Sequence, residues 1–125
     1  MSLHSSGEMY LESIYVLRQK HEGVHAIDVS EYMGFSKPSV SRALKLLRAD
    51  GYIEIDGNDH ITLTPAGEDI ASKIFERHTI LTEILVRLGV DEKIAVDDAC
   101  KIEHDISDAT FEAIKRYVES KKSAE

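Results

Sequence analysis

Two short helical patterns joined by a tight turn constrain the fold of this chain more than any other feature of its sequence. Residues 27–33 favour a short helix, in which Asp28 followed by Glu31 suits a capping box at the start. Gly34 is placed to end this helix, because glycine readily adopts the left-handed conformation found at helix C-termini. A second helix is predicted for residues 37–50. Two short helices with such a turn are typical of a helix-turn-helix.

The second of these helices has one apolar face and one polar, basic face. Ser36 is a good N-cap, and Pro38 falls in the first turn, where its missing N–H is harmless. The polar face favours DNA contact through Ser36, Lys37, Pro38, Ser39, Ser41, Arg42, Lys45 and Arg48. The alternative is a helical hairpin whose basic face is merely solvated.

A small hairpin is predicted directly after this helix. Residues 52–55 and 60–64 alternate apolar and polar side chains, as strands do, and the residues between them are turn formers. A hairpin in this place is the wing of a winged helix. The tip of the wing is acidic apart from His60, so we expect the preceding helix to supply most of the DNA contacts.

The rest of the chain predicts helices without strands. A long helix is expected over residues 65–88, with an apolar stripe that includes His78 and Leu88, and two shorter helices follow. The predicted fold class is therefore mainly α with a small β-wing. Residues 1–65 are expected to form a winged helix-turn-helix DNA-binding domain, and residues 66–125 a helical metal-binding and dimerisation domain.

Charge and composition narrow the class of protein. The formal net charge of −8 over 125 residues argues against a protein that coats nucleic acid indiscriminately. The charge is uneven, however, because residues 36–49 contain four basic side chains and no acidic one. No apolar run approaches the roughly 20 residues of a membrane span, the N-terminus lacks a signal-peptide core, and one cysteine permits no internal disulfide. We therefore expect a cytoplasmic protein with no membrane partner.

Candidate metal ligands gather near the end of the sequence. Cys100, Glu103 and His104 stand at positions i, i+3 and i+4, which places a thiol, a carboxylate and an imidazole on one face of a helix. His78 adds a further imidazole on the long helix. The alternative is structural, since such residues are often a solvated helix face, a buried cysteine or a core histidine.

The first helix, expected over residues 7–21, offers two more ligand types. Its apolar residues form one stripe, and Met9 and Glu12 project from another side, so Met9 is not explained as core filler. The six candidates supply thioether, thiolate, imidazole and carboxylate groups. This mixed set suits Fe²⁺, Co²⁺, Ni²⁺ or Zn²⁺ and suits Mg²⁺ or Ca²⁺ poorly, whereas Mn²⁺ generally prefers more oxygen ligands.

Several separated motifs carry a resemblance to a known family. They are EMYLESIY at residues 8–15, SKPSVS at 36–41, LTPAG at 63–67, RH at 77–78 and ACKIEH at 99–104. Over nearly its whole length the chain resembles the metalloregulator family of the diphtheria toxin repressor and the manganese transport regulator. The resemblance implies a homodimer, formed through the C-terminal helices, whose winged helices bind double-stranded operator DNA only when the metal site is filled. It assigns Met9, Glu12, His78, Cys100, Glu103 and His104 as the metal ligands.

The two branches of that family differ at the ligand positions, and this chain combines them. Met9 and Cys100 resemble the iron-dependent branch, where the manganese branch would place carboxylates. Glu12 and the end of the sequence at residue 125 resemble the manganese branch, which lacks the C-terminal barrel of the iron type. Val96 and Thr82 stand where the iron branch would put ligands of an ancillary site. We expect Fe²⁺ as the effector, with Mn²⁺ second and Zn²⁺, Co²⁺ or Ni²⁺ as surrogates.

The predicted function is a metal-dependent transcriptional repressor of metal uptake genes, and not an enzyme. The chain has no His-Glu-x-x-His motif, and a saturated ligand set leaves no open position for a substrate. Two alternatives stay open from the residues alone. One is a winged-helix regulator that responds to a small organic ligand or to oxidation of Cys100, and the other is a winged helix that binds proteins and never DNA.

Overall fold

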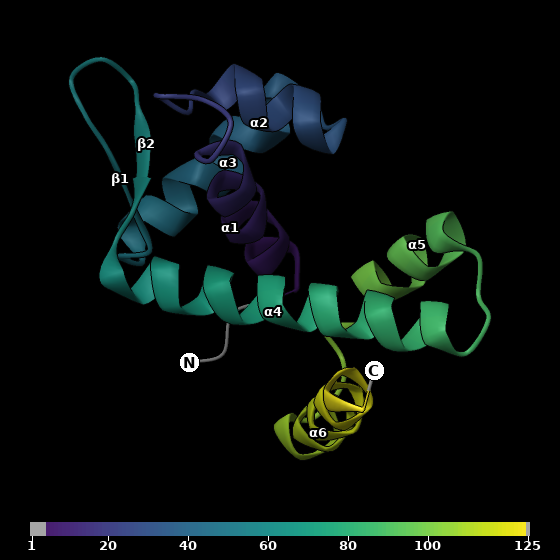
Figure 1. Cartoon of the computed structure of the whole chain (residues 1–125). Helices are drawn as coiled ribbons and strands as arrows, with labels where there is room; N and C mark the ends of the chain where they lie inside the picture. Colours follow the sequence, from purple (N-terminus) through teal and green to yellow (C-terminus); the bar gives the residue numbers. More distant parts are fainter. Residues whose placement is uncertain (1–4, 125) are drawn as a thin grey trace. The chain divides into compact units, whose positions relative to one another are not determined.

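A computed structural model describes residues 5–124 of the chain (Figure 1). Over these residues it has six helices and one two-stranded antiparallel sheet, which confirms the predicted fold class. The elements are α1 (Ser5–Leu17), α2 (Ala26–Met33), α3 (Lys37–Ala49), β1 (Ile53–Ile55), β2 (Ile61–Leu63), α4 (Pro65–Arg87), α5 (Glu92–Ile102) and α6 (Asp108–Ser123). They form two compact units, the first ending at Ser72 and the second beginning at Lys73.

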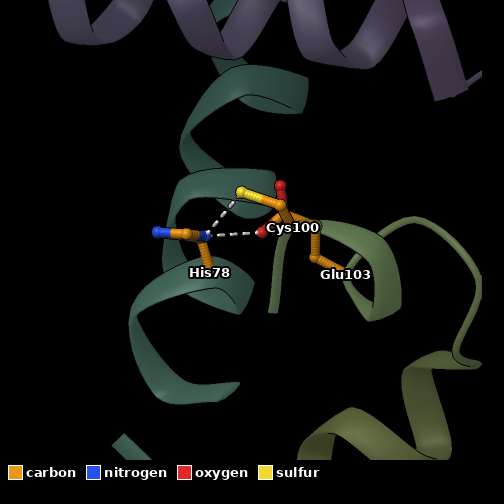
Figure 2. A group of neighbouring side chains, drawn as sticks. All are labelled: His78, Cys100 and Glu103. Carbon is orange, nitrogen blue, oxygen red and sulfur yellow. Dashed lines mark hydrogen bonds and ion pairs between the residues drawn. The ribbon is translucent and has the colours of Figure 1, made fainter. Parts of the chain in front are cut away.

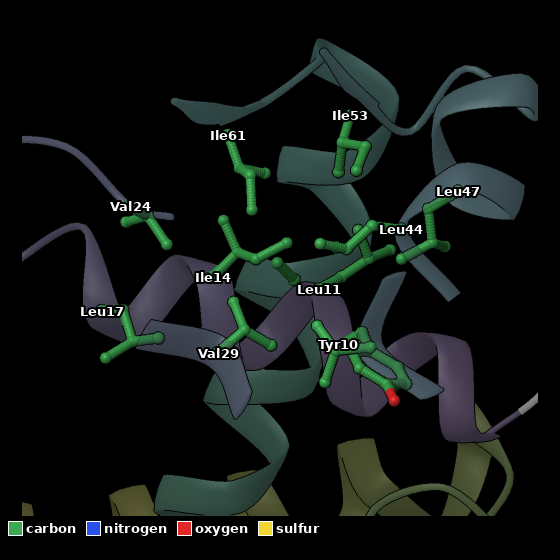
Figure 3. Close-up of a cluster of buried hydrophobic side chains, with 12 residues drawn as sticks. Tyr10, Leu11, Ile14, Leu17, Val24, Val29, Leu44, Leu47, Ile53 and Ile61 are labelled. Carbon is green, nitrogen blue, oxygen red and sulfur yellow. The ribbon is translucent and has the colours of Figure 1, made fainter. Parts of the chain in front are cut away.

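The core of the first unit is built around the apolar stripe of α1 (Figure 3). Leu11 and Ile14 are completely buried, because their spacing puts both on the face of the helix that turns toward the other elements. Val29 of α2, Leu44 of α3 and Ile53 of β1 belong to the same cluster. Burial of each such side chain contributes about 1.5–3 kcal/mol, so this cluster fixes α3 relative to α1.

The first helix is shorter than predicted. The periodic pattern indicated a helix over residues 7–21, but α1 ends at Leu17 and residues 18–20 form a turn. The chain then reaches the hairpin, where the carbonyl of Val24 accepts a 2.8 Å hydrogen bond from the N–H of Ile61. This pairing requires an early reversal of the chain, and it prevails over the local helical pattern.

The helix-turn-helix has most of the predicted caps. Gly34 ends α2 with φ of +72°, and the Ser36 hydroxyl accepts a 3.3 Å hydrogen bond from the N–H of Ser39 at the start of α3. The start of α2 differs from the prediction. His25 is the N-cap, and the carboxylate of Asp28, at the third helical position, accepts a 2.8 Å hydrogen bond from the N–H of His25. Aspartate is favourable both at the N-cap and at the third helical position, so the sequence pattern did not decide which of the two Asp28 occupies.

The wing is a short hairpin whose strands are shorter than predicted: β1 starts one residue later, at Ile53, and β2 is one residue shorter at each end. In its register Ile53 lies opposite Leu63. A carboxylate oxygen of Asp56 accepts hydrogen bonds from the N–H groups of His60, at 2.9 Å, and Asn58, at 2.8 Å. These two bonds hold the pKa of Asp56 below its usual range, the bond from His60 having the larger effect. The carboxylate form of Asp56 therefore organises the turn of the wing.

The long helix α4 starts as the sequence predicts, and its first turn lies directly against the wing. The Thr64 hydroxyl accepts a 3.2 Å hydrogen bond from the N–H of Gly67, and Pro65 occupies the first helical position. A Cβ at position 67 would lie only 2.0 Å from the carbonyl oxygen of Tyr52. Glycine is therefore required at this close approach between α4 and the backbone before β1.

The second unit has a core of its own between α4 and α6. Ile80, Phe111 and Val118 are buried there. The apolar stripe of α4 was predicted to include Leu88, but 72% of this side chain is exposed, because α4 ends at Arg87 and Leu88 belongs to the following turn. Neither α4 nor any other helix among the described residues has the length and apolar character that crossing a membrane requires.

Candidate metal centre

Three side chains with metal-ligating atoms lie close together in the second unit, where α4 faces the end of α5 (Figure 2). Nδ1 of His78 is 3.0 Å from Oε2 of Glu103 and 3.7 Å from Sγ of Cys100. One potential ligand atom from each of the three lies within 4.8 Å of the other two. Figure 2 shows the three side chains pointing toward one another. Half of the predicted ligand set is thus assembled within this unit.

The local structure of α5 explains how two of these groups reach the same place. Asp91 caps the start of the helix, and Ala95 and Ala99 form its buried stripe. Cys100 lies on the last turn and Glu103 is the C-cap, three residues further on, so both project from one side of the helix. The predicted i, i+3 relation is therefore present, although the helix ends just before the carboxylate.

Glu103 is the most constrained of the three groups, because its side chain is 0% exposed. Oε2 is approached by His78, whereas Oε1 lies 3.4 Å from Nε2 of His104 and accepts no hydrogen bond from any residue in the described part of the chain. Burying a carboxylate with incomplete hydrogen bonding costs free energy. A divalent cation would supply the missing charge compensation, so the residues present fit a metal ion.

The donor chemistry points to the same class of ion. The centre offers an imidazole nitrogen, a carboxylate oxygen and a thiol sulfur, a combination that suits a divalent transition metal. Cys100 is exposed while Glu103 is buried, so an ion can reach the sulfur from solvent and be held by the shielded carboxylate. His104, whose side chain is 5% exposed, directly follows Glu103 in the turn after α5.

The remaining two predicted ligands are carried by α1 in the first unit. Met9 is 38% exposed, which agrees with the prediction that it lies outside the buried stripe of this helix. Glu12 is half-buried, one turn further along. The main chain of Met9 is held by the hydroxyl of Ser13, which donates a 2.8 Å hydrogen bond to its carbonyl. The ligand role of Met9 and Glu12 stays a prediction.

The basic face of α3 is turned away from the core. Val40, Leu44 and Leu47 are buried on one side of the helix. The exposed side chains include Ser36, Lys37, Pro38, Ser41, Arg42, Lys45 and Arg48. Ser39 is half-buried, and its hydroxyl lies 2.9 Å from that of Ser36 and 3.5 Å from Nη2 of Arg42. A surface of this kind is available to DNA, and the contacts predicted for these residues stay predictions.

Sequence reasoning missed Arg77, the residue before His78. Its guanidinium donates hydrogen bonds to the carbonyl oxygens of Glu103, at 3.1 Å, and Ile106, at 2.9 Å, and pairs with the carboxylate of Asp108. Two of its three partners are main-chain atoms, which leave no signal in the side-chain pattern. The available signs were its position beside a candidate ligand and its place in the RH motif at residues 77–78.

Comparisons with known proteins agree with this arrangement. Residues 2–61 match the family model described as "Iron dependent repressor, N-terminal DNA binding domain". Residues 64–124 match the family model described as "Iron dependent repressor, metal binding and dimerisation domain". Together these matches leave out only a few residues of the chain.

Individual relatives cover most of the chain. An uncharacterized HTH-type transcriptional regulator of Methanocaldococcus jannaschii is 33% identical over 122 residues, 96% of this chain and 98% of that protein. The transcriptional regulator MntR of Escherichia coli is 34% identical over 110 residues, 88% of this chain and 71% of the relative.

A solved structure described as a manganese-dependent transcriptional repressor in complex with manganese has a TM-score of 0.82 and 26% identity over 90% of this chain. The chain spans about half, 52%, of the length of that structure. The two domain models and the relatives that are a third identical lead to one conclusion: the chain belongs to the diphtheria toxin repressor and manganese transport regulator family of metal-dependent transcriptional repressors, which are DNA-binding regulators and not enzymes.

Proposed function

We propose that this chain is a metal-gated repressor that binds operator DNA as a homodimer and controls genes for metal uptake. The observation that carries the proposal is the cluster of His78, Cys100 and Glu103, in which a buried carboxylate, an imidazole and a thiol lie within 4.8 Å of one another. Such a cluster stabilises a folded protein poorly by itself and suits a divalent ion well.

The gating follows from where the ligands lie in the sequence. Residues 1–65 form the DNA-binding domain in this proposal, and residues 66–125 form the metal-binding and dimerisation domain. Met9 and Glu12 belong to the first, and the other four ligands, His78, Cys100, Glu103 and His104, to the second. An ion held by both sets joins the domains, and it thereby favours the one arrangement in which two recognition helices match two half-sites. Moving a population from about 1:99 to 99:1 needs about 5.5 kcal/mol of differential affinity.

We propose Fe²⁺ as the preferred effector and Mn²⁺ as the second choice. The support for iron is the sulfur of Cys100 beside His78, because thiolate and thioether ligands favour Fe²⁺ over Mn²⁺, which prefers oxygen. The solved relative in complex with manganese supports the second choice. Zn²⁺, Co²⁺ and Ni²⁺ are expected to bind as surrogates, since they prefer nitrogen and sulfur ligands.

The DNA contacts are proposed for the exposed face of α3. Pro38 and Ser39 are placed to pack on thymine methyl groups, Arg42 to reach a base edge or a phosphate, and Lys45 and Arg48 to contact phosphates. In a dimer, the two helices would read half-sites one turn of DNA, about 34–36 Å, apart. The net charge of −8 on the whole chain limits sequence-independent binding to DNA.

The direct test is a mobility-shift experiment with DNA from upstream of the chain's own gene, under anaerobic conditions. The DNA should be retarded with Fe²⁺ or Mn²⁺ and released by a chelator. Identical retardation with metal and with chelator would refute metal gating and favour an organic ligand or a redox signal. Absence of retardation under every condition would instead favour a winged helix that binds proteins.

Two variants separate the metal site from the DNA-binding surface. Cys100→Ala should remove the response to metal while leaving the weak, metal-independent binding unchanged. Lys45→Ala should weaken DNA binding at every metal concentration. It should also reduce the slope of the logarithm of the binding constant against the logarithm of the salt concentration by about one, as expected for the loss of one phosphate contact. Lys20→Ala, at an exposed position in the turn after α1, is the matched control and should change neither property. The reverse pattern for the first two variants would contradict the assignment.

A further inference from the structure

Arg77 connects α4 to the turn that follows α5. Its Nη1 donates to the carbonyl oxygens of Glu103 and Ile106, at 3.1 and 2.9 Å, and its Nη2 pairs with the carboxylate of Asp108. The guanidinium carbon also lies 5.4 Å from the centre of the Phe111 ring. The side chain of Arg77 is only 14% exposed, so these contacts are largely shielded from water.

The carbonyl of Glu103 belongs to the C-cap of α5, where the helix supplies no N–H further along to bond it. The carbonyl of Ile106 lies in the turn between α5 and α6, directly before the N-cap Ser107. A cation at this end also interacts favourably with the helix dipole. Arginine is suited to the position, because its planar fork donates to several acceptors at once and stays charged at all relevant pH values.

These contacts hold the part of the chain that carries two candidate ligands. Glu103 and His104 lie between the start of the turn and Ile106, the second acceptor of Arg77. His78, the next residue of α4, contacts the carboxylate of Glu103 at 3.0 Å. Two successive residues of one helix thus hold the same glutamate, one by its main chain and the other by its side chain.

We propose that Arg77 is a positioning residue of the metal centre, which holds Glu103 and the turn around it in the ligand geometry before an ion binds. This inference rests on the metal site proposed above. Arg77 is not itself a ligand, because a guanidinium cation cannot donate electrons to a metal ion. It acts through the backbone of Glu103, and it lowers the cost of ordering the ligands when the ion arrives.

The test compares full-length variants in which only the arginine differs. Arg77→Met removes the charge and all donors but keeps a long apolar side chain. Arg77→Lys keeps the charge, but a single ammonium group cannot satisfy two carbonyls and Asp108 in the same way. Arg87→Met is the matched control, because Arg87 lies on the same helix and its Nε donates a 3.1 Å hydrogen bond to the carboxylate of Glu83, which is not among the proposed ligands.

Three measurements are made on each folded variant with Co²⁺ and Mn²⁺ as probes. They are the dissociation constant of the ion, the thiolate-to-cobalt charge-transfer absorption, and hydrogen exchange of the amides in residues 103–108 without metal. Arg77→Met should weaken binding of both ions by about 10–100-fold, alter the cobalt absorption and speed exchange in that segment. Arg77→Lys should show an intermediate loss, and Arg87→Met none.

The outcomes distinguish this inference from the proposed function. If Arg77→Met is less stable to heat but binds both ions with the affinity and spectrum of the wild type, Arg77 is a structural residue and the inference is wrong. If the wild type itself shows no thiolate-to-cobalt band, the proposed centre is wrong and the inference falls with it. Should Arg77→Met fail to fold, Arg77→Lys decides: wild-type affinity overturns the inference, and reduced affinity with unchanged folding supports it.

Discussion

Glu103→Gln tests whether the buried carboxylate serves the fold or the ion. The carboxylate is fully buried, with Oε2 3.0 Å from His78 and Oε1 3.4 Å from His104. Glutamine has the same shape, and its oxygen can still accept from His78 while its amide group faces the ring of His104. The substitution therefore removes the charge without removing volume or leaving a void.

The expected magnitudes differ between the metal-free and the metal-bound protein. Without metal, replacing a buried charge by a neutral isostere should leave the free energy of unfolding unchanged or raise it by about 1 kcal/mol. With free metal at about 100 times its dissociation constant, the wild type should gain about 2.7 kcal/mol of stability. If Glu103→Gln weakens binding of the ion about 100-fold, the gain in stability at the same metal concentration falls to about 0.4 kcal/mol.

The assay is urea-induced unfolding, followed by circular dichroism, with metal and with chelator. Glu112→Gln makes the same chemical change at an exposed position of α6, and its gain from metal should equal that of the wild type. The reasoning would be refuted by a Glu103→Gln variant that loses several kcal/mol without metal, because the carboxylate would then be a structural group of the metal-free fold. A variant that keeps the full gain from metal would refute the ligand role.

Further predictions concern the fold and the choice of ion. Gly67→Ala should lower the free energy of unfolding by about 1–3 kcal/mol in a urea titration, because a Cβ lying 2.0 Å from the oxygen of Tyr52 outweighs the gain in helix propensity. Cys100→Asp should shift the ratio of Mn²⁺ to Co²⁺ affinity toward Mn²⁺, measured by competition with a chelating indicator, since an oxygen ligand replaces sulfur. The hydrogen bond from Arg18 holds the pKa of Glu68 below its usual range. The pair therefore stabilises the first unit at pH values above the pKa of Glu68 in the unfolded chain, about 4.3, and this contribution is lost as the pH falls through the lower pKa of the folded protein. Glu68→Gln should abolish that part of the pH dependence in an acid unfolding titration.

The local features of the fold were predictable because short-range rules determine them. Gly34 and Ser36 end one helix and start the next, as their backbone preferences and capping chemistry indicate. The end of α1 was not predictable in the same way, because the pairing of Val24 with Ile61 joins residues far apart in the sequence. Local periodicity carries no information about such a pairing, and the longer helix was the natural expectation.

The candidate site shows the same division. The relation between Cys100 and Glu103 follows from helical spacing alone, whereas the approach of His78 depends on how α4 packs against α5. A stripe on α4 predicted that His78 would face another element, and the resemblance implied that it shares a metal site with Glu103. The direct 3.0 Å contact between the two side chains comes from the structure. The role of Arg77 lay furthest from prediction, since carbonyl oxygens are the same for every residue type.

Glu103 also shows how the fold sets stability against a binding role. A core designed for stability alone would place an apolar residue at a position that is 0% exposed, because a buried carboxylate gains less than it loses on leaving water. This chain keeps the carboxylate there, gives it an imidazole at 3.0 Å, and fixes its backbone with Arg77. The side chain that carries this destabilising charge is therefore held in the buried position and does not turn outward to water. Such an arrangement is expected of a site whose missing stabilisation comes from a cation, and it makes the free energy of the metal-free state part of the response to metal.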